Sequence, residues 1–171
     1  IGAILAPLDA MTAAPDVARL LSEAGGGVLV TEADRADGLG DDVRVVGIAT
    51  IGESDREPGP GPSDRDAPVA LFRTSGTTGA PKTFHLSLTN IATVVEALID
   101  WGGVRERDRV MLPLPMHHVY PLITAALPAL TVGAALVLPE SPSGAHIATA
   151  MRRTGPTVLI GVPRLFEALL A

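Results

Sequence analysis

Short runs of aliphatic residues alternate with stretches of helical periodicity along most of this chain. The aliphatic runs predict strands, which occupy residues 4–8, 27–31, 43–49, 69–73, 110–114, 134–138 and 157–160. Strands that alternate with helices form parallel sheets, because the helix carries the chain back before the next strand begins. The pattern therefore predicts an α/β fold with a mainly parallel, doubly wound sheet flanked by helices.

Helices are predicted where apolar residues recur every three or four positions. The first follows Thr12, which is suited to cap it, and ends at the glycines 25–27. The second begins near Ser87, the third covers 145–153, and a fourth begins at Arg164. These segments connect the predicted strands, as a doubly wound sheet requires.

Residues 52–66 depart from this alternation. They are mainly Gly, Pro, Ser and charged residues with no apolar pattern, which predicts a surface loop. A linker between domains is the alternative, but the chain before it is too short to form a domain. We therefore expect residues 1–171 to form one partial domain that contains this loop.

The composition excludes several kinds of function. The chain has no cysteine, so disulfides, thiol catalysis and zinc–thiolate sites are excluded. Its formal net charge of −6 and the lack of a basic patch argue against a nucleic-acid partner. The chain opens on Ile1 without a signal peptide, so we expect a cytoplasmic protein. It stops at Ala171 inside an apolar helical pattern, so we also expect a fragment of a longer protein.

The clearest chemical signal lies between the strand at 69–73 and the helix that begins near Ser87. Residues 74–82 read Thr-Ser-Gly-Thr-Thr-Gly-Ala-Pro-Lys. Hydroxyl groups, backbone N–H groups and a cation are the groups that phosphate oxygens need, and glycine lets the backbone approach closely. A strand, a glycine–hydroxyl loop and then a helix predict a polyphosphate-binding site.

The P-loop of nucleotide triphosphatases is the nearest generic motif, and Gly76 to Thr83 fits it except at Pro81. Proline has no N–H to donate to a phosphate and cannot adopt a left-handed turn. A P-loop enzyme also needs a later strand that ends in an acidic residue, and only Glu140 comes close to that position. A P-loop ATPase remains one alternative, and a nucleotide-binding module without catalysis is another.

The segment Thr74 to Lys82 resembles the phosphate loop of the adenylate-forming acyl- and aryl-CoA ligases, the AMP-binding superfamily. Further matches follow the family's order at Gly2-Ala-Ile-Leu-Ala-Pro-Leu8, at Leu112-Pro-Leu-Pro-Met-His-His-Val-Tyr-Pro-Leu122 and at Thr157-Val-Leu-Ile-Gly-Val-Pro163. The His-His-Val-Tyr-Pro version of the second match is most similar to bacterial long-chain fatty-acid–CoA ligases. The resemblance covers nearly the whole chain and implies part of the large N-terminal domain of such an enzyme.

The resemblance also assigns the uncharged stretch 122–138. That stretch is nearly long enough to span a bilayer, which takes about 20 residues. Pro128 and Gly133 divide it, and the family's pattern makes it a buried helix, a turn and a strand rather than a membrane span.

For the phosphate loop, the resemblance implies contacts with ATP. Lys82 would balance charge on the β and γ phosphates while a carboxylate attacks the α phosphorus. A solvated loop lysine is the alternative for this residue. The other residues implied to bind ATP are Thr74, Ser75, Gly76, Thr77, Thr78 and Gly79.

For the matching segment Leu112–Leu122, the resemblance implies a site for the reacting carboxylate of the substrate. His118 aligns with the family's histidine near the reacting carboxylate and is the candidate catalytic residue; hydrogen bonding within a loop is its alternative role. His117 occupies the variable position before it, and Tyr120 and Pro121 would shape the wall of an acyl pocket. On an extended segment the two histidines should point in opposite directions, so joint chelation of a metal is not expected.

Three other aromatic side chains are expected to lie outside the site. His85 and His146 should be structural or exposed, and Trp101 should pack against the protein rather than stack on a ligand. Two positions depart from the family pattern, since Thr83 and Leu88 stand where glycine and histidine are usual.

The implied parent reaction joins a small carboxylate, by this resemblance a fatty acid, to CoA with ATP and Mg²⁺. The family's Mg²⁺-binding glutamate segment and its C-terminal domain with a catalytic lysine are absent from the sequence, so we expect these 171 residues to be inactive alone. The acyl chain length, the final acceptor, the oligomeric state and peripheral membrane association stay open.

Overall fold

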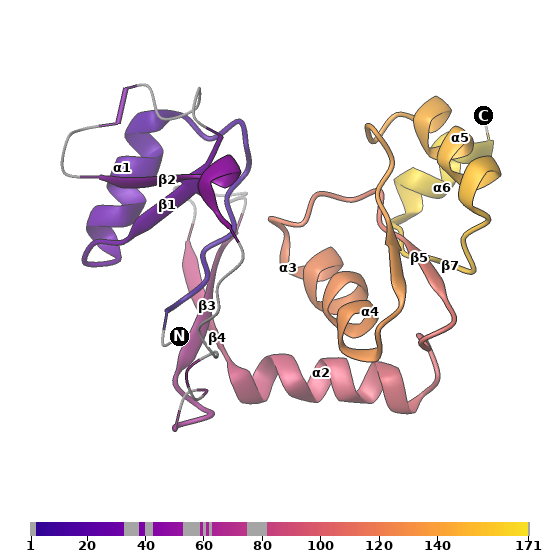
Figure 1. Cartoon of the computed structure of the whole chain (residues 1–171), viewed down its shortest axis with the longest axis horizontal. Coiled ribbons are helices and arrows are strands. Elements are labelled where there is room, and N and C mark those ends of the chain that lie inside the picture. Colours follow the sequence, from indigo (N-terminus) through magenta and orange to yellow (C-terminus); the bar gives the residue numbers. More distant parts are fainter. Residues whose placement is uncertain are drawn as a thin grey trace. The chain divides into compact units, whose positions relative to one another are not determined.

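A computed structural model of the chain describes residues 3–32, 38–39, 43–52, 59, 61, 63–74 and 82–170 (Figure 1). The chain divides into two compact units, Leu8–Gly59 and the combination of Ile1–Pro7 with Pro60–Ala171. One boundary between the units falls between Pro7 and Leu8, and the other falls inside the Gly- and Pro-rich segment 52–66. Most of that segment, including much of the predicted surface loop, lies outside the described residues.

The smaller unit holds a helix and two parallel strands. Its elements are α1 (Ala14–Glu23), β1 (Val28–Thr31), β2 (Arg44–Gly47) and the 3₁₀ turn η2 (Ile48–Thr50). β1 pairs with β2 in parallel, and α1 buries Val17 and Leu20. The predicted cap at Thr12 is wrong, because Ala13 is the N-cap residue and no side chain caps this helix. The strand expected at 43–49 is shorter because its end winds into η2.

In the larger unit, β3 (Pro68–Arg73) pairs along both of its edges. β4 (Thr83–Ser87) lies antiparallel to it along one edge. Along the other edge, the backbone N–H of Leu5 donates to Val69 O at 2.9 Å and that of Leu71 donates to Leu5 O at 2.8 Å. The strand expected at 4–8 is therefore reduced to a single bridge at Leu5.

The register of the β3–β4 hairpin is fixed by its apolar face. Phe72 is only 2% exposed, and its ring stacks on that of Phe84 with centroids 5.9 Å apart. Because side chains alternate along a strand, a slip of one residue would expose Phe72 and lose this contact. The contact between Phe72 and Phe84 thus fixes which residues of β3 and β4 face each other where the loop joins the two strands.

β4 leads directly into α2 (Leu88–Asp100), the helix predicted to begin near Ser87. The Ser87 hydroxyl accepts a hydrogen bond from the Asn90 backbone N–H at 3.2 Å. The Asn90 side-chain oxygen in turn accepts from the Ser87 backbone N–H at 3.1 Å, which completes a capping box. This cap fixes the point at which the strand becomes a helix.

A second sheet of the larger unit has the strand order β6–β5–β7, with all strands parallel. Its strands are β5 (Arg109–Met111), β6 (Ala135–Val137) and β7 (Val158–Leu159). The connecting helices are α3 (Val119–Pro121), the π-helical segment η3 (Leu122–Ala126), α4 (Leu127–Val132) and α5 (Gly144–Thr154), and α6 (Pro163–Leu170) follows β7.

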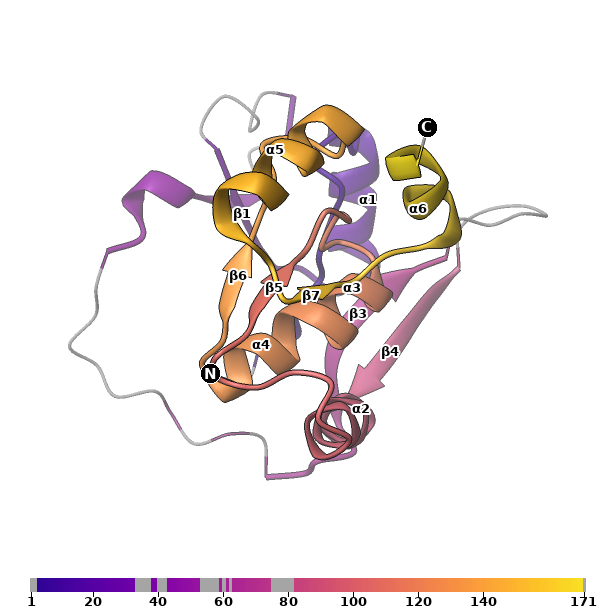
Figure 2. The same cartoon turned by 90° about the vertical axis from the view of Figure 1, so that its right-hand side faces the viewer.

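The two connections of this sheet run in opposite directions, outward from β5 to β6 and then back across β5 to β7. Right-handed crossovers therefore place α4 and α5 on opposite faces of the sheet. Figures 1 and 2 show these helices on either side of the strands. The predicted fold class, a mainly parallel and doubly wound α/β sheet, is confirmed.

Small residues let η3 and α4 pack closely on this sheet. The core there consists of Val104, Val110, Leu112, Ala125, Ala126, Ala129 and Ala134. The segment 122–138 is the predicted helix, turn and strand, with Gly133 at φ 75° where the helix ends. No helix in the described part of the chain is long and apolar enough to cross a membrane.

The amino end of the same sheet is joined by a polar network centred on Arg109. Its guanidinium donates to Thr154 O at 2.8 Å and to Gly155 O at 2.6 Å, the last carbonyls of α5. The Arg109 backbone N–H donates to Thr157 Oγ1 at 3.0 Å, and that hydroxyl donates to Asp108 Oδ1 at 2.8 Å. This network ties the start of β5 to the end of α5 and to the residue just before β7.

Candidate functional site

The ends of the predicted phosphate loop meet at the end of the β3–β4 hairpin where the loop joins the two strands. Thr74 N–H donates to Lys82 O at 2.8 Å, and Lys82 N–H donates to Thr74 Oγ1 at 3.2 Å. Both residues are exposed. Five predicted ATP-binding residues, Ser75, Gly76, Thr77, Thr78 and Gly79, lie outside the described residues, as does Pro81. Of the predicted phosphate contacts, the structure therefore places Thr74 and Lys82.

The loop connects two antiparallel strands, which corrects the expected order of strand, loop and helix. β4 was not predicted, although Phe84 and Leu86 alternate with polar residues as a half-buried strand would. In a P-loop enzyme the loop opens directly into a helix whose N-terminus faces the phosphates. Here the five residues of β4 separate the loop from α2. The described residues on either side of the loop therefore differ from the P-loop arrangement.

Glu140, the acidic residue weighed for a P-loop enzyme, is exposed beyond β6. Its carboxylate lies 3.8 Å from His146 Nε2. Among the described residues, no three His, Asp or Glu side chains are grouped so that they could hold a metal ion.

The segment predicted to line an acyl pocket and the family-matching segment at 157–163 converge at the carboxyl end of the β6–β5–β7 sheet. One follows β5 at residues 112–118 and the other follows β7 at residues 160–162. Tyr120 Oη donates to Gly161 O at 3.2 Å and so joins them directly. In open α/β sheets, ligands bind at this end, where neighbouring connections leave for opposite faces. The position of both segments fits a substrate site.

Gly161 has a packing requirement in this site. A Cβ atom placed there would come within 2.9 Å of the Phe166 ring and 2.8 Å of a Leu165 methyl carbon. Those distances are shorter than van der Waals contact, so with a larger residue the side chains of Leu165 and Phe166 would have to shift. Glycine thus allows α6 to pack directly on the loop that accepts the Tyr120 hydrogen bond.

The chain turns at residues 116–118, and this corrects the expected geometry of the two histidines. Their ring centroids lie 4.1 Å apart with an angle of 51° between the planes, so the side chains do not point in opposite directions. His118 N–H donates to Pro115 O at 3.2 Å, and His118 is the N-cap residue of α3. His118 is exposed and His117 is half-buried.

The other two predicted pocket residues differ in exposure. Pro121 is fully buried, whereas Tyr120 is 44% exposed. Pro121 therefore packs in the interior, and Tyr120 is partly open to solvent. The structure brings His117, His118 and Tyr120 together on one turn and the start of one helix.

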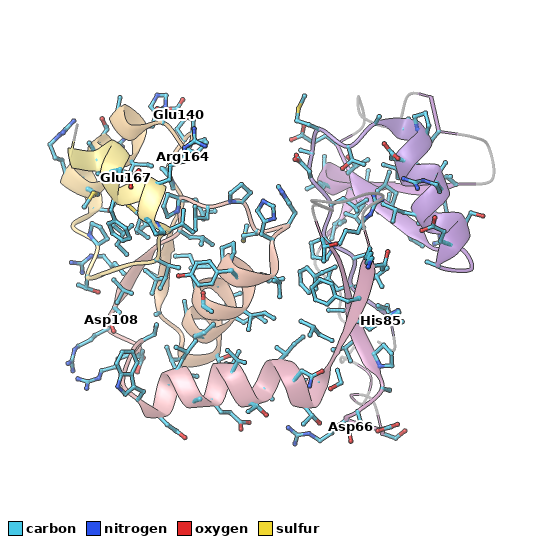
Figure 3. All side chains as sticks on the ribbon, turned by 180° about the vertical axis from the view of Figure 1, so that it is seen from behind. Asp66, His85, Asp108, Glu140, Arg164 and Glu167 are labelled. Carbon is cyan, nitrogen blue, oxygen red and sulfur yellow. The ribbon has the colours of Figure 1, made fainter. Side chains whose placement is uncertain are left out.

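The residues expected to lie outside the site have different environments. His85 is exposed and projects from β4 (Figure 3). His146 Nδ1 lies 2.5 Å from Ser141 Oγ and 3.1 Å from Ser143 Oγ, within the cap of α5. Both agree with the expectation. Trp101 is 83% exposed, so the expectation that it packs against the protein is wrong.

Two arginines were missed in the sequence. Arg73 directly precedes the phosphate loop, and Arg109 caps α5 from a distant part of the chain. A cation next to a phosphate loop is a signal that the sequence itself contains. The role of Arg109 had no local signal, because its partners lie 45 and 46 residues further along.

Comparison with known proteins places this chain among adenylate-forming enzymes. A family model described as "AMP-binding enzyme" matches residues 1–171. A feruloyl-CoA synthase from Amycolatopsis sp. is 26% identical over 176 residues, covering 99% of this chain and 35% of that protein. A 4-coumarate–CoA ligase 5 from Oryza sativa subsp. japonica is 30% identical over 181 residues, covering 95% of this chain and 34% of its own length.

The fold is similar to that of a solved structure. The crystal structure of ATP-bound MatB from Rhodopseudomonas palustris is similar with a TM-score of 0.81 and 24% sequence identity. The similarity covers 99% of this chain and 36% of that one. The chain thus spans about a third of the length of the curated relatives that it matches.

Proposed function

The chain belongs to the AMP-binding enzyme family, and from that premise we propose that it supplies the ATP-polyphosphate site and part of the carboxylate site of a carboxylate–CoA ligase. The observation that carries the proposal is the closed hairpin end, where Thr74 and Lys82 bring the two ends of the glycine–hydroxyl loop together. The pairing of Thr74 with Lys82 holds the two ends of the loop together, which lowers the conformational entropy that the loop would lose on binding a phosphate.

The proposed reaction begins with attack of a carboxylate oxygen on the α phosphorus of ATP. As that bond forms, the bond from the α phosphorus to the bridging oxygen breaks, which gives an acyl-adenylate and pyrophosphate. Lys82 is exposed at the hairpin end and would stabilise the negative charge that develops on the leaving pyrophosphate. CoA would then displace AMP to give the thioester.

His118 is proposed to contact the reacting carboxylate, with His117, Tyr120 and Pro121 beside it in the acyl pocket. Support comes from the convergence of the segments after β5 and β7 at the carboxyl end of the sheet, joined by Tyr120 and Gly161. The exposed imidazole of His118 at the start of α3 is placed to hydrogen-bond a ligand that enters from that end.

A long-chain fatty acid is the proposed carboxylate, and it is supported by the His-His-Val-Tyr-Pro sequence at 117–121. The two curated relatives are named for feruloyl and coumarate substrates, which are aryl acids. Comparing ATP–pyrophosphate exchange with palmitate and with 4-coumarate would separate these classes. This comparison needs a protein that carries the present chain together with the glutamate and lysine segments of the family.

For the 171 residues alone, we expect ATP binding without exchange. Isothermal titration calorimetry should show that ATP binds and that Lys82→Ala weakens binding by about tenfold or more, the effect of one charge-assisted contact. Lys82→Arg should retain most of the affinity, because it keeps the charge. Unchanged binding by Lys82→Ala would contradict the proposed phosphate site.

Catalytic assays on the same chain separate the alternatives. Steady ATP hydrolysis that needs no carboxylic acid and is lost in Lys82→Ala would indicate a hydrolase. Robust ATP–pyrophosphate exchange with a fatty acid would contradict the proposal that this chain is inactive alone.

A further inference from the structure

Arg73, the last residue of β3, has a buried polar atom with no hydrogen-bond partner. Its guanidinium Nε is inaccessible to solvent, and the described residues provide no acceptor for its N–H. Leaving a buried donor unpaired costs about 1–3 kcal/mol, and more for a charged group. A structure that keeps such a donor normally has a ligand, an ion or a water for it.

The register of the hairpin places Arg73 next to the proposed phosphate site. Arg73 is paired with Thr83, one position beyond the Thr74–Lys82 pair that closes the loop. Side chains alternate between the two faces of a strand, so Arg73 lies on the face opposite Phe72. Lys82 precedes Thr83 and by the same rule lies on the opposite face from Arg73. Two cations thus flank one end of the hairpin.

Among the residues that the structure describes, Arg73 also has no anionic partner. Within the described part of the chain it forms no ion pair, unlike Arg19, which lies 2.7 Å from Asp16. A guanidinium remains charged at every physiological pH, so Arg73 cannot avoid the cost of partial burial by losing its proton. An anionic ligand at the terminal guanidinium nitrogens would supply the missing charge, and a shift of the side chain would be needed for Nε to reach an acceptor on that ligand.

We propose that Arg73 binds the polyphosphate of ATP from the face of the hairpin opposite Lys82. This inference rests on the proposed function, because it requires that the chain bind ATP at this hairpin. A guanidinium offers several N–H donors in one plane, and this geometry matches two oxygens of a phosphate. Arg73 and Lys82 would then hold the β and γ phosphates between them, with their charges on either side of the leaving pyrophosphate.

The test compares Arg73→Met with wild type for binding of MgATP and of inorganic pyrophosphate. Methionine keeps the apolar stem of arginine and removes the unpaired N–H. Affinity for both ligands should fall by about tenfold or more. The thermal unfolding midpoint without ligand should stay the same or rise, because the unpaired buried donor is gone. A purely structural arginine would instead lower the midpoint.

Two further variants sharpen the test. Arg73→Lys keeps the charge but loses the planar donors, so its affinity should fall between those of wild type and Arg73→Met. Arg44→Met removes an exposed strand arginine from the smaller unit and should leave both affinities within about twofold, which controls for net charge.

The inference is overturned if Arg73→Met binds MgATP and pyrophosphate within twofold of wild type. It is also overturned if Arg44→Met weakens binding equally, or if Arg73→Met has a lower unfolding midpoint than wild type. If Lys82→Ala weakens binding and Arg73→Met does not, only the present inference fails. If wild type binds neither ligand, the proposed function fails with it.

Discussion

Thr74 and Lys82 are joined by three hydrogen bonds, and the Thr74 hydroxyl takes part in two of them. The backbone N–H of Thr74 donates to Lys82 O at 2.8 Å. The hydroxyl donates to the same oxygen at 3.3 Å and accepts from the Lys82 N–H at 3.2 Å. The side chain of a loop residue thus replaces part of the ladder that the strands would otherwise continue.

Thr74→Val should therefore loosen the loop without removing any charge. Valine keeps the shape of threonine but loses both hydroxyl contacts, so the Lys82 N–H is left without its partner. We expect ATP affinity to fall by about threefold to tenfold, because the loop must be ordered when the ligand binds. Calorimetric titration measures the effect. Thr74→Ser should retain most of the affinity, and a loss as large as in Thr74→Val would contradict this role for the hydroxyl.

Tyr120→Phe should weaken the connection between the segment that follows β5 and the segment that follows β7 at the carboxyl end of the sheet. The substitution removes only the hydrogen bond from Tyr120 Oη to Gly161 O. Such a bond contributes about 0.5–1.5 kcal/mol to the free energy of unfolding, which urea denaturation can measure. Tyr120→Leu also removes the ring and should cost more. Equal stability of wild type and Tyr120→Phe would show that the hydrogen bond does not join the segments in solution.

Arg109→Ala should destabilise the chain by about 2 kcal/mol, because the last carbonyls of α5 lose a charged donor. The matched control is Arg152→Ala, which removes an exposed arginine near the end of the same helix. Its guanidinium donates to Thr149 Oγ1 at 3.2 Å, and its loss should change the free energy of unfolding by less than about 0.5 kcal/mol. Similar losses in both variants would contradict a special role for Arg109.

Asp108 should make the stability of the larger unit depend on pH in the acid range. The Thr157 hydroxyl and then the Arg105 backbone N–H donate to its carboxylate, and they lower the pKa of Asp108 below its ordinary value of 3.8. A lowered pKa in the folded state stabilises the fold above the ordinary value. That contribution is lost as pH falls through the folded-state pKa.

The corresponding measurement follows urea unfolding of wild type and Asp108→Asn between pH 6 and pH 2.5. Wild type should be the more stable protein near pH 6, and the difference should shrink below about pH 4 as Asp108 takes up a proton. Thr157→Ser keeps the donating hydroxyl and should follow wild type. A difference that is constant across this range would contradict the role of Asp108.

Local sequence patterns predicted the helices and most strands, but they did not reveal how β4 pairs. The stretch Thr83–Ser87 alternates correctly for a strand. Its identity as one side of a hairpin depends on Phe72 and Phe84, which meet across the loop. The resemblance of the loop to nucleotide-binding motifs therefore suggested a helix where the structure has a strand first.

The contacts between distant residues of the candidate site could not be predicted from the sequence either. The segments around His118 and Gly161 were found from their motifs, but the bond between Tyr120 and Gly161 joins residues 41 positions apart. The turn at 116–118, which brings the two histidine rings together, also depends on how the chain leaves β5 toward α3. Spacing along the sequence indicated which residues matter and could not give their orientation.

The position of β5 in the centre of its sheet has a consequence for how the chain folds. The β3–β4 hairpin closes between residues 8 apart, whereas Arg109 reaches Thr157 over 48 residues. Closing the longer loop costs roughly 1.6 kcal/mol more chain entropy. The hairpin can therefore form early during synthesis. In contrast, β5 can pair along its two edges only after β6 and β7 have left the ribosome. Until β7 emerges, β5 exposes an open edge on which a chaperone or a second nascent chain could pair.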